Sequence, residues 1–166
     1  MRTVDRSSGS MVPVMKRNRY GYGWTIELSL IERATRILGI AHPVNVCVTG
    51  RMDMTTLGVF DGEKNGAWRI YLDRFLTTRQ ASLTLWHELV HVAQAERAGG
   101  MRELDRRLDR ERLAARLDGP RKRKFFRLRA YQNLPLEREA EERAQQLHKR
   151  LPLAKATEGT RTWWPW

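Results

Sequence analysis

The chain has 166 residues, of which 41% are hydrophobic, a length and composition that suit one globular domain rather than two. Its one cysteine, Cys47, excludes an internal disulfide and a cysteine-rich metal site, so any metal must be held by histidine and carboxylate side chains. The formal net charge of +12 favours contact with nucleic acid or an anionic surface and does not indicate a fold.

No stretch of the sequence has the length and hydrophobicity of a signal-peptide core or of a membrane-spanning helix. We therefore expect a cytoplasmic protein without a transmembrane segment. Residues 1–19 are polar and are predicted to form a flexible arm. The folded domain is expected to span 20–154, followed over 155–166 by a tail that ends in RTWWPW.

A helix and a small sheet are predicted first in chain order. Apolar residues at helical spacing follow Thr25, which can cap the helix, and Gly39 can end it. The alternating valines of PVNVCVT (43–49) predict a strand, and two β-rich runs over 56–73 predict a hairpin. The hairpin contains two turn-forming pairs, Asp61-Gly62 and Asn65-Gly66. Together these runs predict a sheet of at least three strands.

Helical signals dominate the rest of the chain. Thr77 and Gln80 have capping-box spacing before a predicted helix over 78–98, and two glycines follow that helix. Two more helices, one highly charged and one near the C-terminus, are predicted over 101–117 and 135–150.

The sequence HELVH (87–91) in the long helix is the strongest functional signal. His87 and His91 lie four residues apart, so on a helix their imidazoles share one face and can bind one metal ion. Glu88 is close enough to hold a metal-bound water, as metal-assisted hydrolysis requires. The plainer alternative is that no metal is bound and both histidines are ordinary hydrogen-bonded residues. The apolar surroundings of this helix argue against it, because buried polar groups need partners.

A hydrolytic zinc site needs a third protein ligand. The metzincin pattern asks for Gly and His at positions where this chain has Gln94 and Arg97, so that class is excluded. The candidates are His148 and four acidic residues of the last helix, Glu137, Glu139, Glu141 and Glu142. Glu137 and Glu139 flank the apolar face of that helix on opposite sides, so periodicity does not choose between them. Alternatively, the acidic cluster is a solvated face paired with arginines.

HELVHVAQ followed by YQNLPLEREAEERA resembles the gluzincin arrangement, in which HExxH on one helix is completed by a glutamate on a later helix. The form ExEA is similar to ImmA/IrrE-type peptidases and to small HExxH peptidase-like domains found near bacterial contractile injection systems. The resemblance implies that His87, His91 and Glu139 bind zinc and that Glu88 is the general base. It also implies an edge strand before the active-site helix, for which WRIYLD (68–73) is the candidate.

The chain departs from this family pattern at several places. A very basic insert separates the two motifs, and Arg143 stands where an acidic residue often follows the third ligand. No further histidine corresponds to the one that stabilises the oxyanion in thermolysin-like enzymes. Tyr131 and His148 are candidates for that role, and a packing role is the alternative for the tyrosine.

The segment RKRKFFRLRA (121–130) carries six basic residues and no acidic one. It could bind nucleic acid, with the two phenylalanines stacking on bases and the phosphates held by Arg121, Lys122, Arg123 and Lys124. Alternatively, the phenylalanines anchor the segment to the core and the basic side chains are solvated. The aromatic tail similarly could contact a membrane surface, single-stranded nucleic acid or an apolar groove of this chain.

The sequence as a whole predicts an α+β domain of minimal zincin type with a small twisted sheet, an active-site helix and a C-terminal ligand helix. The predicted function is a zinc metallopeptidase that acts on a protein or peptide substrate. The alternative is a basic nucleic-acid-binding or regulatory protein on a zincin fold, including one that acts on DNA-bound proteins.

Overall fold

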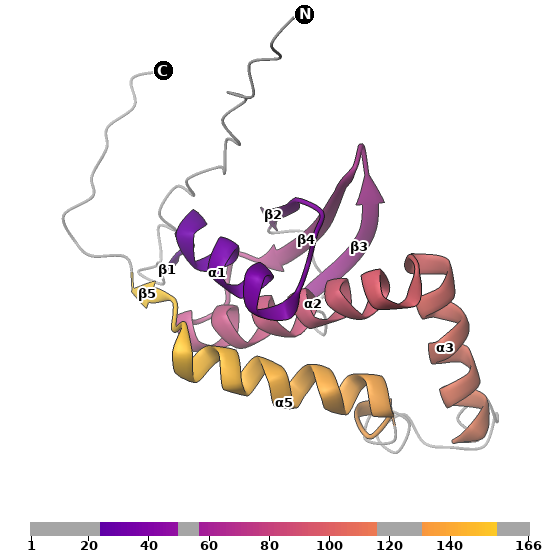
Figure 1. Cartoon of the computed structure of the whole chain (residues 1–166). Coiled ribbons are helices and arrows are strands. Elements are labelled where there is room, and N and C mark those ends of the chain that lie inside the picture. The colour runs from indigo at the N-terminus through magenta and orange to yellow at the C-terminus, as the bar shows by residue number, and fades with distance from the viewer. Residues whose placement is uncertain (1–23, 50–56, 116–130, 156–166) are drawn as a thin grey trace, which may run out of the picture.

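The computed structural model describes residues 24–49, 57–115 and 131–155. Within these ranges the fold combines four helices with a three-stranded mixed sheet and a separate two-stranded pair, so the expected α+β class is confirmed (Figure 1). The predicted arm, the basic residues 121–124 and the tail beyond residue 155 lie outside the described residues. None of the described helices combines the length and the apolar character needed to cross a membrane.

The three-stranded sheet consists of β2 (Val44–Thr49), β3 (Gly58–Lys64) and β4 (Ala67–Asp73). Its order is β2-β4-β3, with β4 parallel to β2 and antiparallel to β3. The predicted strand and hairpin are therefore present. The expectation that residues 68–73 form an edge strand is wrong, because β4 is the central strand of this sheet.

The two glycine-containing pairs of the hairpin have different roles. Asn65 and Gly66 have φ angles of 56° and 74° and form the two-residue turn, as this pair favours. Asp61-Gly62 is not a turn. The strand register shifts between Phe60 and Gly62, which marks a β-bulge inside β3, and Gly62 there has a φ of 87°.

The first helix, α1 (Leu28–Leu38), is shorter at its start than the sequence predicts. Thr25 does not cap it, because Trp24–Thr25 form β1, which pairs with β5 (Ala154–Lys155), and the N-cap residue is Glu27. The end of α1 agrees with the prediction, since Gly39 adopts the left-handed conformation there.

The later helices begin where the sequence predicts. The capping box of Thr77 and Gln80 starts α2 (Thr78–Ala98), and the following Gly99 is left-handed. Helix α3 (Met101–Ala114) ends three residues before the predicted position, and α5 (Pro135–Arg150) matches the predicted helix.

The core lies between the sheet and α2 and continues between α2 and α5. Alternate side chains of β4 are buried, namely Trp68, Ile70 and Leu72. Helix α5 packs along α2 through small buried residues, which permit close approach of the two backbones. Helix α3 turns away from the end of α2 and leads toward the start of α5 (Figure 1). This arrangement places the middle of α2 beside the first turns of α5.

Candidate metal centre

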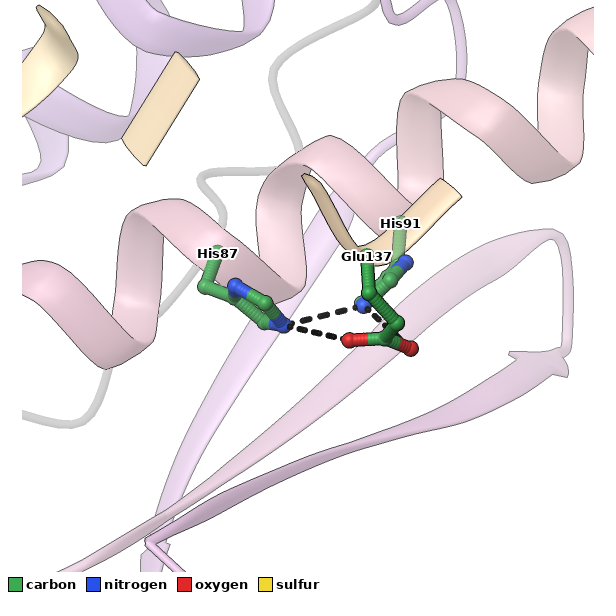
Figure 2. A group of neighbouring side chains, drawn as sticks. All are labelled: His87, His91 and Glu137. Atoms are coloured by element: carbon green, nitrogen blue, oxygen red, sulfur yellow. Dashed lines mark hydrogen bonds and ion pairs between the residues drawn. The ribbon is translucent and has the colours of Figure 1, made fainter. Parts of the chain in front are cut away.

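Helix α2 directs two imidazoles toward the first turn of α5 (Figure 2). The Nε2 atoms of His87 and His91 lie 3.1 Å apart, as the four-residue spacing on one helix face predicts. His91 is buried, whereas His87 is partly exposed, so the pair opens to solvent on the His87 side.

Glu137 in the first turn of α5 completes the group. Its carboxylate oxygens lie 3.4 Å from Nε2 of His87 and 3.7 Å from Nε2 of His91. Glu137 is 7% exposed, which is unusual for a carboxylate unless it has charged or hydrogen-bonding partners. Among the described residues, these three form the one group whose donor atoms are close enough to hold a single metal ion.

The spacing of the two imidazole nitrogens and the Glu137 carboxylate is compatible with a tetrahedral ion. Zinc bonds of about 2.0–2.2 Å at tetrahedral angles place neighbouring ligand atoms roughly 3.3–3.6 Å apart. The two Nε2 atoms lie 3.1 Å apart, and Glu137 places one carboxylate oxygen 3.4 Å from Nε2 of His87 and its other oxygen 3.7 Å from Nε2 of His91, which are separations around that range. Three ligands leave one coordination position open, which is the arrangement that catalytic zinc sites use.

Glu139 is not part of the group formed by the two histidines, and Glu137 is the glutamate of the candidate ligand set. The carboxylate of Glu139 forms an ion pair with Arg97 at 2.7 Å and with Arg143 at 3.3 Å. The reason is the helical period. Glu137 precedes the buried Ala140 by three residues and continues its stripe, whereas Glu139 is rotated by about 100° from it. Periodicity alone did not choose between the two glutamates in the sequence, and the family resemblance favoured Glu139.

The remaining candidate ligands have other partners. Glu142 lies 3.9 Å from Arg138 on an exposed part of α5, as expected of a solvated acidic face. Glu141 is 59% exposed, and its carboxylate is 3.9 Å from Nδ1 of His87. His148 is 2.8 Å from the hydroxyl of Ser82 and lies outside the group of three.

Tyr131, one of the two residues predicted as candidates for stabilising the oxyanion, lies beside the candidate metal centre. Its hydroxyl hydrogen-bonds to Glu137, and the guanidinium of Arg112 lies 5.3 Å from the centre of its ring. Burial and the neighbouring Glu137 raise the pKa of Tyr131 to about 12, so its hydroxyl remains a hydrogen-bond donor at neutral pH. The oxyanion role itself stays a prediction.

The side chain of Glu88 extends from α2 to the sheet. Its Oε2 accepts a hydrogen bond of 2.9 Å from the backbone N–H of Phe60, and its Oε1 has no hydrogen-bond partner among the described residues. Phe60 belongs to β3, an edge strand of the three-stranded sheet. The strand beside the candidate site is therefore β3, and not the predicted β4.

The two carboxyl groups of the site, Glu88 and Glu137, have pKa values shifted in opposite directions by their surroundings. Burial raises the pKa of Glu88, and the positive charges of His91 and His87 only partly oppose it. Burial alone would also raise the pKa of Glu137, but hydrogen bonds from His87, His91 and Tyr131 outweigh it and hold that pKa well below its usual range. Two carboxyl groups whose pKa values are shifted in opposite directions are typical of sites where the two groups have different roles.

Comparisons with protein-family models, with curated proteins and with solved structures find no match to this chain. The family resemblance carried by HExxH and the later glutamates is therefore without independent support. The case for a metal centre rests on the geometry of His87, His91 and Glu137.

Proposed function

We propose that this chain is a zinc-dependent metallopeptidase in which His87, His91 and Glu137 bind the ion and Glu88 is the general base. The observation that carries the proposal is the convergence of two Nε2 atoms and one buried carboxylate, whose two oxygens lie 3.4 and 3.7 Å from those nitrogens. Two histidines with one glutamate are a ligand set used by catalytic zinc sites. Bound there, zinc would polarise a peptide carbonyl and lower the pKa of a coordinated water.

Glu88 is suited to transfer the protons of such a hydrolysis. The N–H of Phe60 holds Oε2, which orients the carboxylate and leaves Oε1 to take a proton. The raised pKa of Glu88 makes it a stronger base than an exposed glutamate. The same oxygen can then return the proton to the leaving amine.

The edge of β3 that faces away from β4, with which no other strand of the described residues pairs, is the surface we propose for an extended peptide substrate. A strand at the edge of a sheet has unpaired backbone groups that can pair with another chain. Phe60 contacts Glu88 from this strand, so a peptide bound along it would lie beside the general base. Tyr131 would hydrogen-bond to the ligand Glu137.

The first test is the zinc content per chain, measured by elemental mass spectrometry on protein without a histidine tag. After dialysis against zinc, the wild type should hold about one ion, and His91→Ala and Glu137→Ala should lose it. Glu139→Ala should keep about one ion, because its carboxylate contacts neither imidazole. Wild-type protein without zinc, or loss with Glu139→Ala and retention with Glu137→Ala, would contradict the proposed site.

A further inference from the structure

We infer that Gln94 is a positioning residue that fixes the tautomer and ring orientation of His91, and that Glu139 and Arg97 hold Gln94 in place. The inference rests on the proposed metal centre, because it concerns how one of the three ligands is presented. It also gives a role to two residues that face away from the ligand atoms.

Gln94 lies one helical turn after His91 and is 2% exposed. Its Oε1 is 2.8 Å from Nδ1 of His91. Its Nε2 donates to the carbonyl oxygen of Leu136 at 2.9 Å and to the carboxylate of Glu139 at 3.0 Å. Both amide hydrogens and the amide oxygen of this buried side chain are therefore used, as burial of an amide requires.

These partners determine which way the amide of Gln94 faces. A carbonyl oxygen and an ionised carboxylate can only accept hydrogen bonds, so the amide nitrogen must face Leu136 and Glu139. The amide oxygen must then face His91, where it can only accept. Nδ1 of His91 consequently carries a hydrogen, so in the neutral ring that metal binding requires, the lone pair is on Nε2, which lies toward Glu137 and His87.

Glu139 and Arg97 keep this arrangement in place from the surface. Arg97 contacts Oε1 of Glu139 at 2.7 Å, while the other oxygen of Glu139 receives Gln94. The Arg97 guanidinium favours the ionised, acceptor-only form of the carboxylate. Because Leu136 and Glu139 flank Glu137 in α5, the contacts of Gln94 also align the helix that supplies the third ligand.

His87 provides the internal comparison. The nearest carboxylate to its Nδ1 is that of Glu141 at 3.9 Å, which is too long for a hydrogen bond, and Glu141 is 59% exposed. Glu141→Gln is therefore the matched control, because it alters a carboxylate near a ligand without removing an orienting hydrogen bond.

The test combines two measurements on Gln94→Leu, Arg97→Leu and the control Glu141→Gln. The first is the zinc dissociation constant from competition with a chelator. Gln94→Leu should weaken zinc binding by about 10- to 100-fold, Arg97→Leu by a few-fold, and Glu141→Gln by less than about two-fold. Arg97 is 46% exposed, so its variant tests the inference even if Gln94→Leu does not fold.

The second measurement is the tautomer of His91, read from imidazole ¹⁵N chemical shifts in metal-free protein at an alkaline pH at which those shifts show a neutral ring. Wild type should carry the hydrogen on Nδ1, and Gln94→Leu should shift the population toward Nε2. Unchanged zinc affinity in both Gln94→Leu and Arg97→Leu, or a wild-type hydrogen on Nε2, would overturn the inference. If wild type binds no zinc, the proposed function fails, and the tautomer still decides the role of Gln94.

Discussion

Two glutamates placed two positions apart on α5 meet opposite environments. Glu137 faces two imidazoles and a tyrosine hydroxyl and is buried, whereas Glu139 faces Arg97 and Arg143 at the edge of the same interface. The helical period alone causes this difference, because a shift of two residues turns a side chain by about 200° around the axis. One carboxylate can therefore bind a cation directly, while the other acts through Gln94.

This pair also shows where sequence analysis of the site succeeds. The spacing of His87 and His91 is local and fixed by the helix, so their convergence could be predicted. The third ligand depends on which face of α5 meets α2, and four nearby glutamates met the chemical requirement. Only Glu137 continues the buried stripe. Neither the amide of Gln94 nor its partners could be found by motif, because Leu136 and Glu139 come from a distant helix.

Replacing Glu88 with glutamine should reduce peptide hydrolysis without changing metal binding. Glu88→Gln keeps an oxygen that can accept the hydrogen bond from Phe60, but it cannot take a proton. Peptide hydrolysis should fall by about 10²- to 10⁴-fold while the zinc content stays at the wild-type level. The measurements are turnover of a fluorescent casein substrate and zinc content on the same sample. Equal turnover in variant and wild type would exclude Glu88 as the base.

At the scale of elements, β3 and α2 approach each other closely where the strand passes the helix. Gly58 at the start of β3 has no room for a side chain, because an added Cβ would meet the methyl group of Thr84 on α2. The hydrogen bond between Phe60 and Glu88 follows two residues later along the same strand. The close approach at Gly58 thus sets how the edge of β3 lies against the candidate general base.

Gly58→Ala should therefore destabilise the fold and disturb the site together. The added methyl would be overpacked against Thr84 and would also lie 3.2 Å from the side chain of Leu72. We expect a loss of about 1–3 kcal/mol in the free energy of unfolding, measured by urea denaturation, with reduced hydrolysis. Thr84→Ser removes the obstructing methyl, so the double variant should recover most of both losses. An unfolding free energy unchanged in Gly58→Ala would contradict this account.

The elements themselves were predictable to the extent that their signals are local. The capping box at Thr77 and the Asn65-Gly66 turn act within a few residues and are present, and the alternating valines of 44–48 do lie in a strand, β2. The strand order depends on a crossover between β2 and β4, which no short pattern encodes. The same limit explains the start of α1, where pairing of β1 with the distant β5 prevented Thr25 from capping the helix.

Over the whole molecule, α2 connects every part of the fold that the candidate site needs. Its middle carries both histidines and Glu88, and it packs on β3, β4 and α5. Two buried tryptophans in or near this helix donate indole hydrogen bonds to backbone carbonyl oxygens far away in the sequence. Trp86 donates to Leu151 at 3.2 Å, and Trp24 donates to Leu76 at 3.0 Å. A metal held by α2 and α5 would add a further link between helices that already meet through apolar packing, the hydrogen bonds of Gln94 and the Arg97–Glu139 ion pair.

Near the C-terminal end of α2, Glu96 joins the helix to the loop after α1 and to the sheet. Its carboxylate accepts hydrogen bonds from the backbone N–H groups of Ala41 and His42 at 2.8 and 3.0 Å, and from the indole of Trp68 at 2.8 Å. Nδ1 of His42 lies 2.9 Å away. Burial alone would raise the pKa of Glu96, but these hydrogen bonds outweigh it and lower the pKa to about 2.

Glu96 should therefore make folding stability depend on acid pH. An unfolded glutamate has a pKa of about 4.3, so the stabilisation is complete above that value and is lost as the pH falls toward the folded pKa of about 2. Glu96→Gln should lower the free energy of unfolding by about 2 kcal/mol at pH 6, because the amide replaces a charged acceptor of several hydrogen bonds. Urea denaturation of both proteins across this pH range measures the effect.

Other carboxylates titrate in both proteins, so the difference in unfolding free energy between wild type and Glu96→Gln isolates Glu96. That difference should shrink steadily below about pH 4, because protonation removes the same charge from the wild type. A difference that stays constant down to about pH 2.5 would show that the charge of Glu96 does not stabilise the fold.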